Sequence, residues 1–140
     1  MLRLKPYSAS MLAFSGSLLI VMGIYFVLLR PSLLAEDLYY MKTSLSVINN
    51  SVPGLSAWLQ KVFWVMGGYI FTTGLLTVYI SFTSFRERTS GAFYIAAVTG
   101  ITSIVLMSVV NFIIKSDFKW LLLIFTLPWL IALILYRLHK

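Results

Sequence analysis

The chain has 140 residues, of which 60% are hydrophobic and 11% are charged. Soluble domains average roughly 45–50% apolar and about 25% charged residues, so this composition excludes an ordinary soluble domain and indicates a membrane protein. The net charge is +7, but the eleven Lys and Arg residues stand in ones and twos at the edges of apolar runs. This scatter does not indicate a nucleic-acid-binding face. Without cysteine, the chain can form no disulfide, thiolate nucleophile or cysteine metal site.

Four apolar runs are long enough to cross a bilayer. The first, residues 11–29, lies between Lys5 and Arg30; at 1.5 Å per residue it spans about 28 Å, close to the roughly 30 Å hydrocarbon core. It is too long for a secretory signal and no A-x-A-like cleavage site follows, so we expect it to be retained. The other three runs cover residues 62–83, 91–114 and 120–136. The sequence therefore predicts one all-α transmembrane domain over residues 1–140, an integral membrane four-helix bundle with antiparallel neighbours.

The long loop between the first two spans, residues 30–61, is expected to be partly helical. Pro31 and the two acids Glu36 and Asp37 favour the start of a short helix that runs to Met41. Residues 49–51 (NNS) and the following Pro-Gly pair predict a turn. Beyond it, apolar residues recur at helical spacing from Leu55, so a short interfacial helix should lead directly into the second span.

Positive charges and tryptophans set the expected orientation. The arginines and lysines on one side lie in very short segments, while those on the other side are mostly spread along the long loop. The two sides differ little in their number of positive residues. Both termini are expected in the cytoplasm, because the positive residues are denser on that side and the first helix usually dominates the orientation. An aromatic belt is expected on the opposite face, formed by Trp58, Trp64 and Trp120. The positive residues on the predicted cytoplasmic side are Arg3, Lys5, Arg86, Arg88, Arg137 and Lys140.

The span interiors contain no Asp, Glu, Lys, Arg or His, which argues against a pump or a secondary transporter. They contain small residues instead. Gly68 with Thr72, and Ala96 with Gly100, form small-xxx-small pairs that allow close helix packing. Asn111 is the most polar side chain at depth, and we expect it to face the bundle or the outer headgroup region and to hydrogen-bond there, as a structural contact or as a contact to a ligand.

The candidate polar contacts are Arg30, Glu36, Asp37, Asn111 and Asp117. Adjacent helical residues point about 100° apart, so Glu36 and Asp37 cannot easily grip one metal ion or divide acid and base roles. We expect them to be helix-start charges, solvated or paired with Arg30 or Lys42. The alternative is a docking site for a polar partner or a lipid headgroup. No catalytic residue, metal site or cofactor is predicted.

Three segments carry a family resemblance: residues 28–41 (LLRPSLLAEDLYYM), 62–69 (VFWVMGGY) and 117–122 (DFKWLL). With them the chain resembles a family of small, uncharacterised bacterial inner-membrane proteins with four spans. In layout, with a long loop after the first span and a Gly-Gly pair near the head of the second, it is more distantly similar to DoxX-like proteins. The resemblance implies a bacterial inner membrane and a four-span fold, and it carries no catalytic residue across.

Three functions remain after these observations. The first is a non-enzymatic accessory or scaffolding subunit that acts through helix packing, either with a membrane protein partner or as a homo-oligomer. The second is a binder of a lipid or quinone-like apolar molecule within the bundle. The third, a membrane enzyme, would need Glu36, Asp37 or Asp117 to be catalytic, and no nucleophile–base pair is visible. The expected surroundings are the lipid bilayer, with no nucleic acid.

Overall fold

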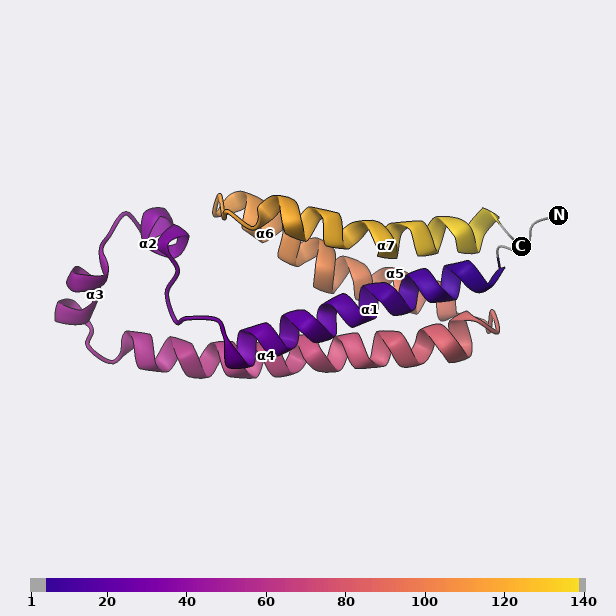
Figure 1. Cartoon of the computed structure of the whole chain (residues 1–140), viewed down its shortest axis with the longest axis horizontal. Coiled ribbons are helices and arrows are strands. Elements are labelled where there is room, and N and C mark those ends of the chain that lie inside the picture. Colours follow the sequence, from indigo (N-terminus) through magenta and orange to yellow (C-terminus); the bar gives the residue numbers. More distant parts are fainter. Residues whose placement is uncertain (1–4, 139–140) are drawn as a thin grey trace.

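The computed structural model describes residues 5–138, which form an all-α bundle (Figure 1). Three of its four long helices are α1 (Lys5–Leu28), α4 (Leu55–Ile80) and α7 (Lys119–Leu138). The remaining one combines α5 (Ala92–Gly100), the π-type segment η2 (Ile101–Val105) and α6 (Leu106–Ile113). All four are long and apolar enough to cross a membrane, so the predicted fold class is confirmed. Arg3 and Lys140, which entered the charge argument, lie outside the described residues.

The helix ends differ from the predicted spans mainly by extension. The first helix begins at Lys5, before the apolar run, and α4 begins at Leu55 and continues through η1 (Ser81–Phe85). Within η1 the backbone of Thr83 leaves helical geometry, which ends the long helix. Polar residues at the membrane surface continue a helix readily, because the backbone hydrogen bonds do not depend on the hydrocarbon environment. Apolar run length therefore underestimates the length of the first, second and fourth helices, whereas the third, Ala92–Ile113, ends within its run of residues 91–114.

The loop between α1 and α4 holds two short helices, α2 (Ala35–Met41) and α3 (Leu45–Ser51). The first confirms the predicted short helix with the two acids in its first turn, but it begins at Ala35 and not next to Pro31. The second corrects the sequence prediction: residues 49–51 form its last turn instead of an open turn. Ser44 caps α3 by accepting a hydrogen bond from the Val47 amide at 3.4 Å, and such a cap satisfies an otherwise unpaired helix-start donor.

Four glycines bring α1 and α4 into close contact along their length. An added Cβ on Gly74 would lie 2.6 Å from the carbonyl oxygen of Gly16, and one on Gly67 would lie 2.9 Å from that of Gly23. Each helix repeats its glycine after seven residues, which is close to two helical turns. The two glycine pairs therefore meet on one antiparallel seam, and the absence of side chains allows the backbones to touch.

The predicted packing role of Gly68 and Thr72 is wrong within this chain. A Cβ on Gly68 would meet nothing within 4 Å, and Thr72 is exposed. Both residues lie on a face of α4 turned away from the seam, because the neighbouring Gly67 already occupies the inward position and successive helical residues are about 100° apart. The glycine that packs is one residue earlier than the sequence pattern suggested.

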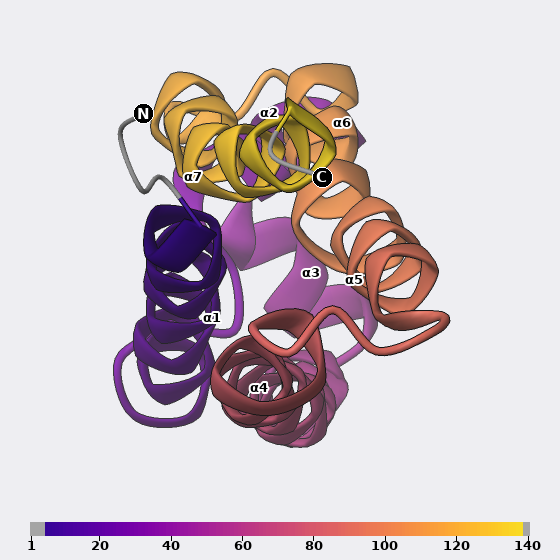
Figure 2. The same cartoon turned by 90° about the vertical axis from the view of Figure 1, so that its right-hand side faces the viewer.

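One end of the bundle, which we call the closed end, is tightly filled. It comprises η1 and α5 together with the start of α1 and the second half of α7, and Figure 2 views the bundle from this end. The indole nitrogen of Trp129 donates a 2.9 Å hydrogen bond to the carbonyl of Ala96, and an added Cβ on Gly100 would collide with the indole ring. Ala96 and Gly100 thus lie at the contact between α5 and α7. The rings of Phe85 and Tyr136 pack in a tilted arrangement in the same core, with centroids 4.4 Å apart.

At the opposite, open end the helices separate. It comprises all of α2 and α6, together with the end of α1, the first half of α4 and the start of α7. Figure 1 shows the α1–α4 pair and the α6–α7 pair spreading apart toward α2. Helices α1 and α4 stay in contact along their length, and α4 also contacts α5 toward the closed end. In the described chain, however, α4 has no substantial contact with α6. This separation creates the candidate site.

Candidate binding chamber and its polar cap

The open end encloses a chamber of about 880 Å³ between the four long helices and α2. This volume lies within the range of roughly 300–1,000 Å³ that small-molecule sites occupy. Its walls are largely apolar, and its polar groups gather toward α2, with a few hydroxyls deeper inside. Representative apolar wall residues are Leu19, Met22, Met66, Ile70, Leu106 and Leu122.

The chamber opens sideways between α4 and α6. Val65 and Tyr69 on α4, and Leu106 and Val110 on α6, line the chamber and are also exposed on the outer surface of the bundle. The wall on the α1 side is more closed, since Leu19 is buried. Because this opening lies between two helices able to span a membrane, it faces the depth at which acyl chains lie.

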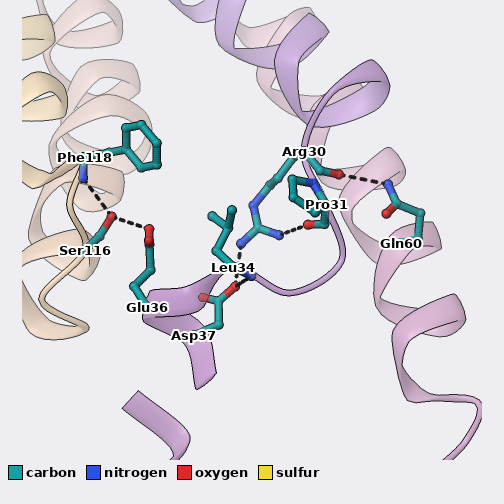
Figure 3. Close-up of polar contacts among 8 residues, drawn as sticks. All are labelled: Arg30, Pro31, Leu34, Glu36, Asp37, Gln60, Ser116 and Phe118. Carbon is teal, nitrogen blue, oxygen red and sulfur yellow. Dashed lines mark hydrogen bonds and ion pairs between the residues drawn. The ribbon is translucent and has the colours of Figure 1, made fainter. Parts of the chain in front are cut away.

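Arg30 is fixed at the polar end of the chamber, directly after α1. Its Nη2 lies 3.3 Å from Oδ2 of Asp37, and its Nη1 donates to the carbonyl of Pro31 at 3.0 Å (Figure 3). The guanidinium carbon sits 3.5 Å from the centroid of the Phe63 ring, a cation–π contact with α4. Gln60 donates to the Arg30 carbonyl at 3.2 Å. The side chain is 10% exposed, so its charge is held in place by its partners.

Asp37 stabilises the start of α2 as well as pairing with Arg30. The same Oδ2 accepts a 2.9 Å hydrogen bond from the backbone amide of Leu34. A carboxylate at the third helical position that reaches back to the N-cap amide satisfies a helix-start donor and complements the helix dipole. Of the two predicted partners, the structure pairs Asp37 with Arg30 and not with Lys42.

Glu36 points the other way and ties α2 to the connection between α6 and α7. Its Oε1 accepts a 2.7 Å hydrogen bond from the hydroxyl of Ser116, which is fully buried and accepts from the Phe118 amide at 3.1 Å. Figure 3 shows the two carboxylates reaching opposite walls of the site. The expected pairing of Glu36 with Arg30 or Lys42 is therefore wrong: α2 covers the polar end of the chamber, and its two acids bond to opposite sides of it.

Of the two remaining candidate residues, Asn111 lines the chamber and Asp117 does not. Asn111 lines the chamber and donates to the Met107 carbonyl at 2.9 Å, so it faces the bundle interior. Asp117 is exposed and does not line the chamber, because its neighbour Ser116 takes the inward position. The chamber thus brings together Arg30, Glu36, Asp37 and Asn111. In residues 5–138 no three histidine, cysteine or carboxylate side chains come close enough to hold a metal ion.

Sequence reasoning missed Ser116, Gln60 and Phe63. Ser116 carried a usable signal, since a serine just before the last apolar run has the position of a helix N-cap. The other two carried none, because their contacts with Arg30 depend on how α1 and α4 approach each other.

Comparison with known proteins finds no protein-family model, curated protein or solved structure that matches this chain. The resemblance to a four-span bacterial family and to DoxX-like proteins stays a prediction.

Proposed function

We propose that this protein binds a lipid or quinone-like amphiphile from the membrane inside the chamber at its open end. One observation carries the proposal: a largely apolar space of about 880 Å³ opens sideways between α4 and α6, and its charged groups stand only at the α2 end. An amphiphile has the same division, with an apolar tail and a polar head. Burying the tail against the wall while the head meets the cap satisfies both parts.

The proposed role is non-enzymatic. Both carboxylates at the chamber already make hydrogen bonds that hold α2, Glu36 to Ser116 and Asp37 to Arg30 and Leu34. The hydroxyl nearest to Glu36, that of Ser116, is buried and supports the start of α7. This arrangement favours holding a molecule over transforming it.

A pair of adjacent threonines on α4 offers the test. Thr73 lines the chamber, whereas Thr72 is exposed on the outer face. Native mass spectrometry of the protein released from lipid nanodiscs should detect a retained lipid-like mass. Thr73→Phe fills part of the chamber and should reduce that retention several-fold, while Thr72→Phe should leave it unchanged. Equal retention by the wild type and both variants, or no retained mass in any of them, would contradict the proposal.

A second candidate, the accessory or scaffolding subunit, is favoured by the outer face of α4. Gly68 and Thr72 lie one turn apart and exposed, and open space surrounds the α-carbon of Gly68. A partner helix or a second copy of the chain can approach closely at such a pair. Under this function Gly68→Leu should abolish copurification of a partner from native membranes, and it should leave lipid retention in the chamber as in the wild type.

We also propose that the protein lies in a bacterial inner membrane with both termini in the cytoplasm. The connection between η1 and α5 holds Arg86 and Arg88 in a short segment, which favours the cytoplasmic side. Trp58, Trp64 and Trp120 are exposed near the open end, as expected at the opposite interface. Reporter fusions after residue 88 and after residue 138 should give cytoplasmic signals, and one within α3 should give a periplasmic signal. A periplasmic signal at either of the first two positions would refute this orientation.

A further inference from the structure

We infer that the amphiphile bound in the chamber has a head that donates hydrogen bonds and carries no negative charge, such as an amine or a hydroxyl group. The inference rests on the proposed function and narrows its ligand class, because it separates amines, alcohols and quinols from fatty acids and other acidic lipids. It follows from the balance of charge and of hydrogen-bonding groups at the polar end of the chamber.

The single cation at the chamber is already neutralised. Arg30 is about nine-tenths buried, pairs with Asp37 at 3.3 Å and lies over the Phe63 ring at 3.5 Å. An acidic head could reach this guanidinium only by competing with Asp37, which also holds the start of α2 through the Leu34 amide. Displacing a paired carboxylate leaves its own charge without a partner, which is costly in a partly buried site.

Glu36 adds a negative charge that nothing at the chamber balances. Within the described chain the only ion pair is that of Arg30 with Asp37, while Glu36 is held by the neutral hydroxyl of Ser116. Lys115 and Lys119, the nearest lysines in sequence to Ser116, do not line the chamber. With one positive and two negative side chains lining it, the polar end carries a net charge of −1 and repels an anionic head.

Several hydrogen-bond acceptors at this end lack a donor. Among the described residues, no donor reaches Oε2 of Glu36, Oδ1 of Asp37 or the side-chain oxygen of Asn111. Carboxylate and amide oxygens accept hydrogen bonds, so a hydroxyl or amine head supplies what they lack. A head with acceptors alone, such as an oxidised quinone, cannot donate to these three oxygens, whereas its hydroxyl-bearing reduced form can.

Three probes that differ only in the head test the inference. Dodecylamine, dodecanol and dodecanoate, each with a diazirine in the tail, are irradiated at pH 7 with the full-length protein in nanodiscs, and the labelled residues are mapped by mass spectrometry. We expect the amine and the alcohol to label wall residues such as Met66 and Leu106 several-fold more than the acid does. Equal or preferential labelling by the acid overturns the inference and leaves the proposed function standing. Failure of all three probes to label the chamber overturns both.

Charge-removing variants make the test specific to the cap. Asp37→Asn keeps an oxygen for the Leu34 amide but frees the Arg30 charge, so it should shift labelling in favour of dodecanoate. Glu36→Gln keeps an acceptor for Ser116 and removes the unbalanced charge, so it should weaken the discrimination against dodecanoate. Asp117→Asn removes an exposed carboxylate that does not line the chamber, and it should leave the head preference unchanged. Wild-type preference in both cap variants, or an equal shift in the Asp117 control, would overturn the inference.

Discussion

The closed and open ends of the bundle are built from the same four helices, yet only one is filled. At the closed end a large aromatic side chain faces small residues: the Trp129 indole lies against Ala96 and Gly100. At the open end the residues that face each other are mostly medium-sized aliphatic side chains, such as Met22 and Leu122, and no tryptophan lines the space between them. Pairing large with small residues brings helices together, whereas the open end keeps its helices apart and leaves the chamber.

The two ends also differ in what polar groups do. At the closed end the buried hydrogen bond from Trp129 joins two spanning helices within the core. At the open end the hydrogen bonds of Glu36 and Asp37 hold the short helix α2, which is attached to its surroundings mainly by these contacts. The comparison indicates a rigid closed end and a cap that can be loosened separately, and three substitutions test it.

The largest effect is expected from Trp129→Ala at the closed end. Removing a buried indole leaves a cavity and takes away the second hydrogen bond to the Ala96 carbonyl, which should lower the free energy of unfolding by about 3–5 kcal/mol. Denaturant or thermal unfolding in detergent, followed by circular dichroism, measures this loss. Trp120→Ala is the matched control, because Trp120 is 61% exposed at the open end and its removal should change stability little. Equal losses at both positions would remove the distinction between the two ends.

A smaller effect is expected from Gly74→Leu on the α1–α4 seam. The new side chain would meet the Gly16 carbonyl oxygen and the Ile20 backbone at less than 3 Å, so the helices must separate at a cost of about 1–3 kcal/mol. The same unfolding assay applies. Gly68→Leu is the control on the same helix, since its new side chain meets open space. If Gly68→Leu were the more destabilising of the two, the seam would be placed on the wrong face of α4.

The smallest effect is expected from Ser116→Ala, and it should be local. The change removes the hydrogen bond to Glu36 and the one from the Phe118 amide, for a loss of about 1 kcal/mol. Hydrogen exchange of the α2 amides should accelerate, while exchange at the closed end should stay as in the wild type. Ser90→Ala, at an exposed serine in the closed-end connection, should accelerate neither. Acceleration spread evenly over the bundle would show that α2 is not a separable cap.

The glycines show how far sequence reasoning reached. The pattern identified small residues on the second span, but it selected Gly68 because that residue pairs with Thr72 at a spacing of four. The structure uses Gly67 and Gly74, which match Gly16 and Gly23 only when the two helices are laid antiparallel. A spacing rule applied to one helix cannot identify the face that meets its neighbour, because the seam depends on both helices together.

The acids show the same limit at the candidate site. The helix-start position of Glu36 and Asp37 was readable from the preceding proline and from the helix dipole. Their partners were not, because Ser116 lies eighty residues from Glu36 along the chain and reaches it only after the α6–α7 connection folds over the open end. Distant hydrogen bonds of this kind leave no periodic trace in the sequence.

The sequence by itself determined that the chain is helical and apolar enough to cross a membrane four times, because run length and hydropathy act locally on each segment. It also indicated a short helix that contains Glu36 and Asp37 and ends at Met41. Only the tertiary structure decided that the helices meet at the Trp129 end and part at the Arg30 end, and that both acids, Arg30 and Asn111 border one chamber. The physical reason is that a cavity is a property of the space between helices: its shape depends on which side chains from separate segments face each other, and that arrangement is fixed only when all four helices pack.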